Sequence, residues 1–131
     1  MSKCRLVKNF SFDEMNIHTL DEILPEIVEF AQEMQQLRDW ARKPMNVNSW
    51  KRTPGQNKAC KGDPRSAHLD ARAVDIKIVV TDSMIWAWKS ICEKHGKIGG
   101  VNRYDTFTHF TDHEDKFGNK SFVIRDKRSN K

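Results

Sequence analysis

The central motif of this 131-residue sequence is Ser66-Ala67-His68-Leu69-Asp70-Ala71-Arg72-Ala73-Val74-Asp75-Ile76. It carries an imidazole and a carboxylate seven positions apart and leads into a β-branched apolar run, which predicts a buried strand over residues 74–80. A second imidazole, His109, lies in a predicted strand over residues 106–111. Two histidines and one carboxylate are a typical ligand set of catalytic zinc, with the fourth position left for water. The motif therefore suggests a metal-assisted hydrolase with His68, Asp75 and His109 as candidate zinc ligands.

Spacing alone leaves alternatives open for these three side chains. Strand alternation places Val74 and Ile76 on one face and Asp75 on the other. Asp75 is costly to bury unless it is paired or bound to a metal, but on that face it can also lie in solvent. Each histidine is either a metal ligand or a hydrogen-bonded structural residue.

The rest of the sequence predicts one small domain over residues 1–131. Ser11 and Glu14 have the spacing of a capping box at the start of a short helix. An apolar stripe from Ile23 to Ala41, repeating every three or four residues, predicts a long amphipathic helix. A further helix is expected to begin at residues 81–83 and to end near Gly96.

Strands are also expected over residues 45–50 and 121–124, with a turn-rich loop over residues 51–66. Gly99 and Gly100 predict a turn, and residues 113–119 predict a polar hairpin loop. The order of these elements favours an α+β fold, a small antiparallel β-sheet with helices packed on one side.

The composition is that of an ordinary soluble globular chain, with 37% hydrophobic and 31% charged residues. No apolar run approaches the roughly 20 residues that span a bilayer, and no signal peptide is recognisable, so we expect a cytoplasmic chain. Cys4, Cys60 and Cys92 form no CxxC pair and are expected to be free thiols. The net charge of +5 fits nucleic acid and an anionic bacterial cell wall equally well. No basic block is interleaved with aromatic residues, however, so we do not expect nucleic-acid binding.

Several segments resemble, in the same order, the family of zinc D-Ala-D-Ala carboxypeptidases and L-alanyl-D-glutamate endopeptidases, whose fold is the Hedgehog/DD-peptidase fold. The resemblance covers nearly the whole chain. It is carried by residues 9–15, residues 47–57, the central motif, residues 98–104 and Phe107-Thr108-His109. It implies that His68, Asp75 and His109 bind Zn2+ and that the substrate is a stem peptide of peptidoglycan.

The same resemblance implies roles for two further residues. Arg52 matches an arginine that binds a substrate carboxylate or stabilises an oxyanion, although a surface ion pair is the alternative. Ser66 is expected to orient substrate or a ligand, or else simply to cap a turn. The tryptophans are expected mainly to pack in the core, and Trp50, which precedes the arginine loop, is the best candidate for one that lines the cleft.

The chain departs from the family pattern in two places. The family usually has Gly where this chain has Ala71, a change that is tolerated if the backbone there does not need positive φ. Relatives place an acidic or histidine general base three or two residues before the last ligand, or two after it. Those positions hold Thr106, Phe107 and Thr111, none of which can act as a base.

Nearby carboxylates are the remaining candidates for the base. On a regular strand Asp105 shares a face with His109, so Asp105 is the predicted base. Asp112 is the alternative if the strand ends or bulges after Phe110, and Asp105 is then a solvated turn residue.

The expected protein is a monomeric zinc-dependent peptidase that cleaves peptidoglycan stem peptides, either as a D-Ala-D-Ala carboxypeptidase or as an L-Ala-D-Glu type endopeptidase. Its compact size resembles that of phage or prophage endolysins, which accumulate in the host cytoplasm and reach the cell wall after release. The alternative is a catalytically inactive module of the same fold that acts as a virion or cell-wall-binding structural protein.

Overall fold

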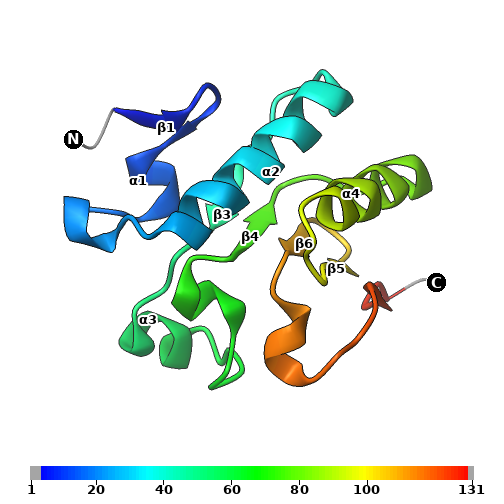
Figure 1. Ribbon diagram of the computed structural model, residues 1–131. Helices are drawn as coiled ribbons and strands as arrows, with labels where there is room; N and C mark the ends of the chain where they lie inside the picture. The colour runs from blue at the N-terminus through cyan, green and yellow to red at the C-terminus, as the bar shows by residue number, and fades with distance from the viewer. Residues whose placement is uncertain (1–3, 130–131) are drawn as a thin grey trace.

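The computed structural model describes residues 4–129 and consists of a mixed sheet with two long helices on one of its faces (Figure 1). The strand order is β3-β4-β6-β5-β7. The strand bounds are β3 Val47–Ser49, β4 Ala73–Ile76, β5 Gly100–Arg103, β6 Thr108–Thr111 and β7 Val123–Asp126. The long helices are α2, Pro25–Ala41, and α4, Asp82–Lys94. This arrangement confirms the predicted α+β class with helices packed on one side.

Shorter elements complete the described chain. A two-stranded ribbon of β1 (Arg5–Val7) and β2 (Phe10–Ser11) leads into α1 (Phe12–Met15). The others are η1 (Leu20–Glu22), α3 (Pro54–Ala59), η2 (Ala67–Asp70) and η3 (Glu114–Phe117). Among the described helices, none combines the length and the apolar character that crossing a membrane requires.

The helix boundaries follow from local capping chemistry. In the capping box of α1, the Glu14 backbone N–H donates to the Ser11 hydroxyl, and the Ser11 backbone N–H donates to the Glu14 carboxylate. Pro25 begins α2, where its missing N–H costs nothing. Thr81 caps α4 by accepting a hydrogen bond from the Met84 backbone N–H at 3.2 Å. The predicted starts of the three helices are therefore confirmed to within two residues.

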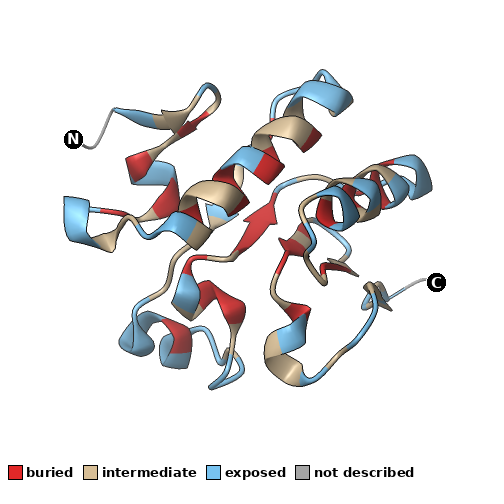
Figure 2. Cartoon of the chain, in the orientation of Figure 1, coloured by how far each residue is buried: buried red, intermediate tan, exposed pale blue. Residues whose placement is uncertain are grey.

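The core lies between the sheet and the long helices (Figure 2). Val74, Val101 and Phe110 are fully buried on the covered face of the sheet. The Trp88 ring of α4 packs edge-on against Phe110 and against Phe30 of α2, with ring centroids 5.8 and 6.1 Å apart. Because this face holds the apolar side chains of each strand, the alternate positions are left for polar groups on the other face.

Three details of the sheet differ from the prediction. The strand predicted over residues 74–80 ends at Ile76, because the Ile78 N–H donates back to the Ile76 carbonyl in a three-residue turn. The segment after Gly99 forms β5 between two partner strands. β7 pairs in parallel with β5, so residues 113–119 are a crossover segment and the prediction of a hairpin in a wholly antiparallel sheet is wrong.

The backbone at Ala71, where the family usually has glycine, adopts the left-handed conformation that favours glycine. Its φ is 58°, at the C-cap of η2, where its N–H donates to the His68 carbonyl. An alanine there costs on the order of 1 kcal/mol relative to glycine in backbone strain. The position therefore does need positive φ, and the chain tolerates this strain directly beside the central motif.

Candidate metal centre

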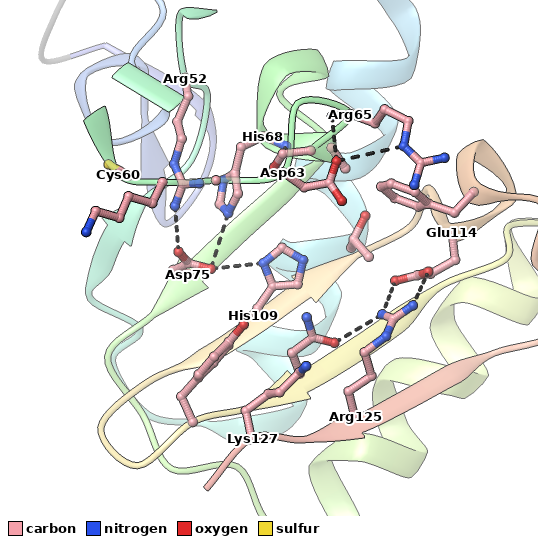
Figure 3. Close-up of a pocket in the computed structure, with 18 of the residues that line it drawn as sticks. Arg52, Cys60, Asp63, Arg65, His68, Asp75, His109, Glu114, Arg125 and Lys127 are labelled. Atoms are coloured by element: carbon pink, nitrogen blue, oxygen red, sulfur yellow. Dashed lines mark hydrogen bonds and ion pairs between the residues drawn. The ribbon is translucent and has the colours of Figure 1, made fainter. Parts of the chain in front are cut away.

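One row of polar side chains crosses the uncovered face of the sheet. The strand register pairs Ser49 with Asp75, Asp75 with His109, His109 with Asn102, and Asn102 with Arg125. Residues paired in this way project to the same face. The last four of them line a cavity of about 660 Å³, and residues in or next to α3, η2 and η3 also line it. Figure 3 shows these side chains around the cavity.

The three predicted zinc ligands converge in this cavity. Oδ1 of Asp75 lies 3.0 Å from Nδ1 of His109 and 3.3 Å from Nε2 of His68. Asp75 and His109 come from adjacent strands, β4 and β6, whereas His68 enters from η2 (Figure 3). His68 and Asp75 are 2% and 7% exposed, so the group is largely removed from bulk solvent. The sequence prediction that these residues lie together agrees with this geometry.

The backbone carbonyl of Trp50 orients the His68 ring on the side away from Asp75. Its Nδ1 lies 2.6 Å from the Trp50 carbonyl, so Nδ1 carries the proton and Nε2 presents its lone pair toward Asp75. A backbone carbonyl behind a histidine is a common support for a metal ligand. A neutral imidazole nitrogen and a carboxylate oxygen 3.3 Å apart are both acceptors, and a cation between them would satisfy both.

Trp50 itself is a core residue. Its ring is 1% exposed, packs edge-on against Phe10 and Phe30, and donates its indole N–H to the Ala71 carbonyl at 3.1 Å. Trp50 therefore packs in the core, as expected for the tryptophans in general, and does not line the cleft. Its contribution to the centre is the carbonyl that orients His68.

The electrostatic environment favours the ligating protonation states. Burial would raise the pKa of Asp75, but the interactions of its carboxylate with the His109 and His68 imidazoles outweigh that effect and hold the pKa well below its usual range. Burial lowers the pKa of His68, although the Asp75 carboxylate opposes this effect. An ionised carboxylate and a neutral imidazole are the forms that bind a metal ion.

Arg52 lines the same cavity and binds Oδ2 of Asp75, the carboxylate oxygen that does not face the two histidines. Its Nη2 donates to Oδ2 of Asp75 at 3.1 Å, its Nε to the Ser49 hydroxyl at 3.0 Å and its Nη1 to the Asn57 side chain at 3.3 Å. Its backbone N–H donates to the His68 carbonyl at 2.9 Å. Arg52 therefore lies within the predicted site, where its guanidinium orients a candidate ligand.

Replacing Arg52 by lysine tests this orienting role. Lysine keeps the charge but cannot make three directed hydrogen bonds from a planar group. We expect the zinc dissociation constant of Arg52→Lys, measured by competition with a chelator, to rise about tenfold, the size of effect typical of residues behind a metal ligand. The exposed Arg42→Lys serves as the matched control. Equal zinc affinity in both variants would contradict the role.

Ser66 and the predicted bases occupy different places. Ser66 lines the cavity and also caps η2, because its hydroxyl accepts a hydrogen bond from the His68 N–H. The structure does not bring Asp105 to the centre: its carboxylate accepts hydrogen bonds from the Ser129 N–H and hydroxyl, and it is not a lining residue. The reason is that β6 begins only at Thr108, so Asp105 lies in the preceding bend.

Asp112 lies on the helix side of the sheet. It is fully buried and accepts a hydrogen bond from Nε of Arg72 at 3.0 Å. The described carboxylates that do line the cavity are those of Asp63, Asp75 and Glu114. Sequence reasoning gave Glu114 no role, and its only local signal is that it follows the strand carrying His109.

A second group of possible metal-binding side chains joins the two long helices. Nδ1 of His95 lies 3.1 Å from Glu29 and 3.5 Å from Glu33. Lys97 already pairs with Glu29 at 2.9 Å. None of these four residues lines the cavity. His95 and Lys97 join the end of α4 to Glu29 of α2, and Glu33 lies beside them.

Comparison with known proteins agrees with this geometry. No curated protein matches the chain. A family model described as Peptidase M15 matches residues 8–111. The matched region contains Arg52, Ser66 and all three converging side chains. The chain therefore belongs to the peptidase M15 family.

Proposed function

We propose that this protein is a zinc-dependent peptidase that cleaves the stem peptides of peptidoglycan. The observation that carries the proposal is the convergence of His68, Asp75 and His109 at one end of a cavity large enough for a peptide. Two imidazoles and one carboxylate suit zinc, and the cavity leaves their other side accessible to substrate. When bound, zinc supplies the Lewis acidity that peptide-bond hydrolysis requires.

The protein's own side chains have distinct parts in this proposal. Asp75 and the two histidines hold the metal, and Trp50 fixes the orientation of His68 through its carbonyl. Arg52 keeps Asp75 in place and offers positive charge to a substrate carboxylate or to a developing oxyanion. Ser66, at the cavity wall, orients either the substrate or the η2 turn.

The biological setting is proposed from the same resemblance. A small basic peptidase that accumulates in a host cytoplasm and acts on the wall after release fits phage or prophage cell-wall lysis. The net charge of +5 favours adsorption to an anionic wall, because opposite charges raise the local protein concentration there.

Digestion of purified peptidoglycan tests the proposal. The zinc-loaded protein is expected to release new ends that mass spectrometry identifies, and a chelator is expected to stop the release. Free D-Ala indicates a carboxypeptidase, whereas new amino-terminal D-Glu or diamino-acid ends indicate an endopeptidase. Stoichiometric zinc without any release would contradict the proposal and favour the catalytically inactive, wall-binding or virion module.

A further inference from the structure

The lining of the cavity carries an excess of positive charge. Five cationic side chains and three carboxylates line it, so with neutral histidines the excess is two charges before any metal is added. The cationic residues are Arg52, Lys61, Arg65, Arg125 and Lys127, and the carboxylates are Asp63, Asp75 and Glu114. Such a lining favours an anionic ligand.

Arg125 is the cationic residue that the fold fixes most firmly at the end of the row opposite Arg52 (Figure 3). Its Nη1 and Nη2 donate to the two oxygens of Glu114 at 2.9 and 3.3 Å, and Nη1 also donates to Asn102 at 3.3 Å. Glu114 is buried and accepts a further hydrogen bond from Asn119 at 2.8 Å. A Cβ at Gly100 would lie 2.9 Å from Glu114, so glycine there makes room for this carboxylate.

These contacts leave one edge of the guanidinium available. Arginine has five N–H donors, and Glu114 and Asn102 engage both N–H groups of Nη1 and one of Nη2. The Nε–H and the second Nη2–H have no partner among the described residues. They form the side-on edge of the guanidinium, which matches a carboxylate in a bidentate pair.

The register sets the distance of this edge from the centre. Arg125 lies two strands beyond His109, and adjacent strands are about 4.8 Å apart, so their Cα atoms are about 10 Å apart across the sheet. An extended peptide covers that distance in roughly three residues. A carboxylate at Arg125 would therefore belong to a residue two or three positions from the scissile bond, on the side away from Arg52.

We propose that the side-on edge of Arg125 binds a substrate carboxylate two or three residues from the scissile bond, and so selects acidic over amidated stem peptides. Lys127, directly after the end of β7 and also in the lining, adds charge to this subsite. Arg125 and Lys127 lie outside residues 8–111, so the subsite belongs to a part of the chain that the family match does not cover. The inference rests on the proposed function for the identity of the peptide.

Matched peptides test the subsite. Two synthetic stem peptides differ only in a carboxylate or a carboxamide at that position, and kcat/KM is measured for each. We expect the wild type to favour the acidic peptide about tenfold, the value of one good charge-assisted pair. Arg125→Gln should bring the ratio close to one by losing activity on the acidic peptide alone. The exposed Lys120→Gln removes a charge outside the cavity and should keep the wild-type ratio.

A second variant separates recognition from folding. Arg125→Lys keeps a cation beside buried Glu114 but lacks the bidentate edge, so it should also lose most of the preference. An unchanged ratio in both variants, or an equal slowing on both peptides, would overturn the proposal.

Binding provides an outcome that does not depend on cleavage. The dissociation constants of the two peptides, labelled for fluorescence anisotropy, should differ about tenfold for the wild type and little for Arg125→Gln. Equal affinity of the wild type for both peptides would overturn the subsite. Failure of cleavage with the affinity difference intact would instead count against the proposed peptidase function.

Discussion

Asp75→Asn is expected to abolish both zinc binding and peptidase activity. Oδ1 of Asp75 lies 3.0 Å from Nδ1 of His109 and 3.3 Å from Nε2 of His68. The Asp75 carboxylate also supplies the only negative charge among the three candidate ligands. Loss of a residue that only hydrogen-bonds to a metal ligand typically weakens metal affinity 10- to 100-fold. Loss of the charged ligand itself should therefore weaken zinc binding by more than about a hundredfold. Metal analysis after dialysis and release from peptidoglycan measure the two losses.

A control variant and a folding measurement make this result specific. Asp39→Asn neutralises an exposed carboxylate on α2 and should retain zinc and activity. Asp75→Asn also removes the charged partner of Arg52, so its thermal melting is measured without metal to separate unfolding from loss of the ligand. A folded Asp75→Asn protein that keeps stoichiometric zinc would contradict the assignment of Asp75 as a ligand.

The candidate ligands could be predicted because their signals are local or belong to a recognisable pattern. Alternation between Val74, Asp75 and Ile76 separates the core face from the site face within one strand. Nothing local, however, states that Asp75 pairs with His109. That register depends on contacts between segments more than thirty residues apart, and here the resemblance to a family supplied it.

The other half of the cavity could not be predicted, because it depends on strand pairing that is not encoded locally. Arg125 reaches the site only because β7 pairs in parallel with β5, whereas the sequence suggested a simple hairpin. Asp105 failed to reach the site for the corresponding reason. Its predicted orientation assumed a regular strand from residue 105, but the ladder with β4 and β5 begins at Thr108.

The carboxyl groups of Glu33 and Asp112 are both buried on the helix side of the sheet, and the sequence did not predict that they lie together. The ionisation of Glu33 is expected to have a large effect on how the stability of the protein depends on pH. Glu33 of α2 is fully buried, and neither of its oxygens has a hydrogen-bond partner in the described structure. Oδ2 of Asp112 is likewise unpartnered. Burial, together with the adjacent Asp112 and Glu29 carboxylates, raises the pKa of Glu33, against the opposing influence of Lys97. Glu33 therefore keeps its proton far above the pH at which a carboxyl group usually ionises.

Glu33→Gln is expected to stabilise the protein increasingly as the pH rises. In the unfolded chain Glu33 has its ordinary pKa near 4.5, whereas in the folded chain its pKa is raised to about 10. Between these two pKa values the unfolded state binds fewer protons, so the free energy of unfolding falls with pH by up to about 1.4 kcal/mol per unit. Glutamine has nearly the same size and shape as the protonated carboxyl group and has no proton to release, which removes this loss.

The difference in unfolding free energy between Glu33→Gln and the wild type should be small near pH 4.5 and reach on the order of 5 kcal/mol by pH 8. Urea unfolding at a series of pH values measures it, and taking the difference cancels groups that titrate equally in both proteins. Glu93→Gln, at an exposed position on α4, should follow the wild-type curve. Parallel curves for Glu33→Gln and the wild type would show that Glu33 is ionised when folded, and its negative charge would then need a bound cation or another partner behind the sheet.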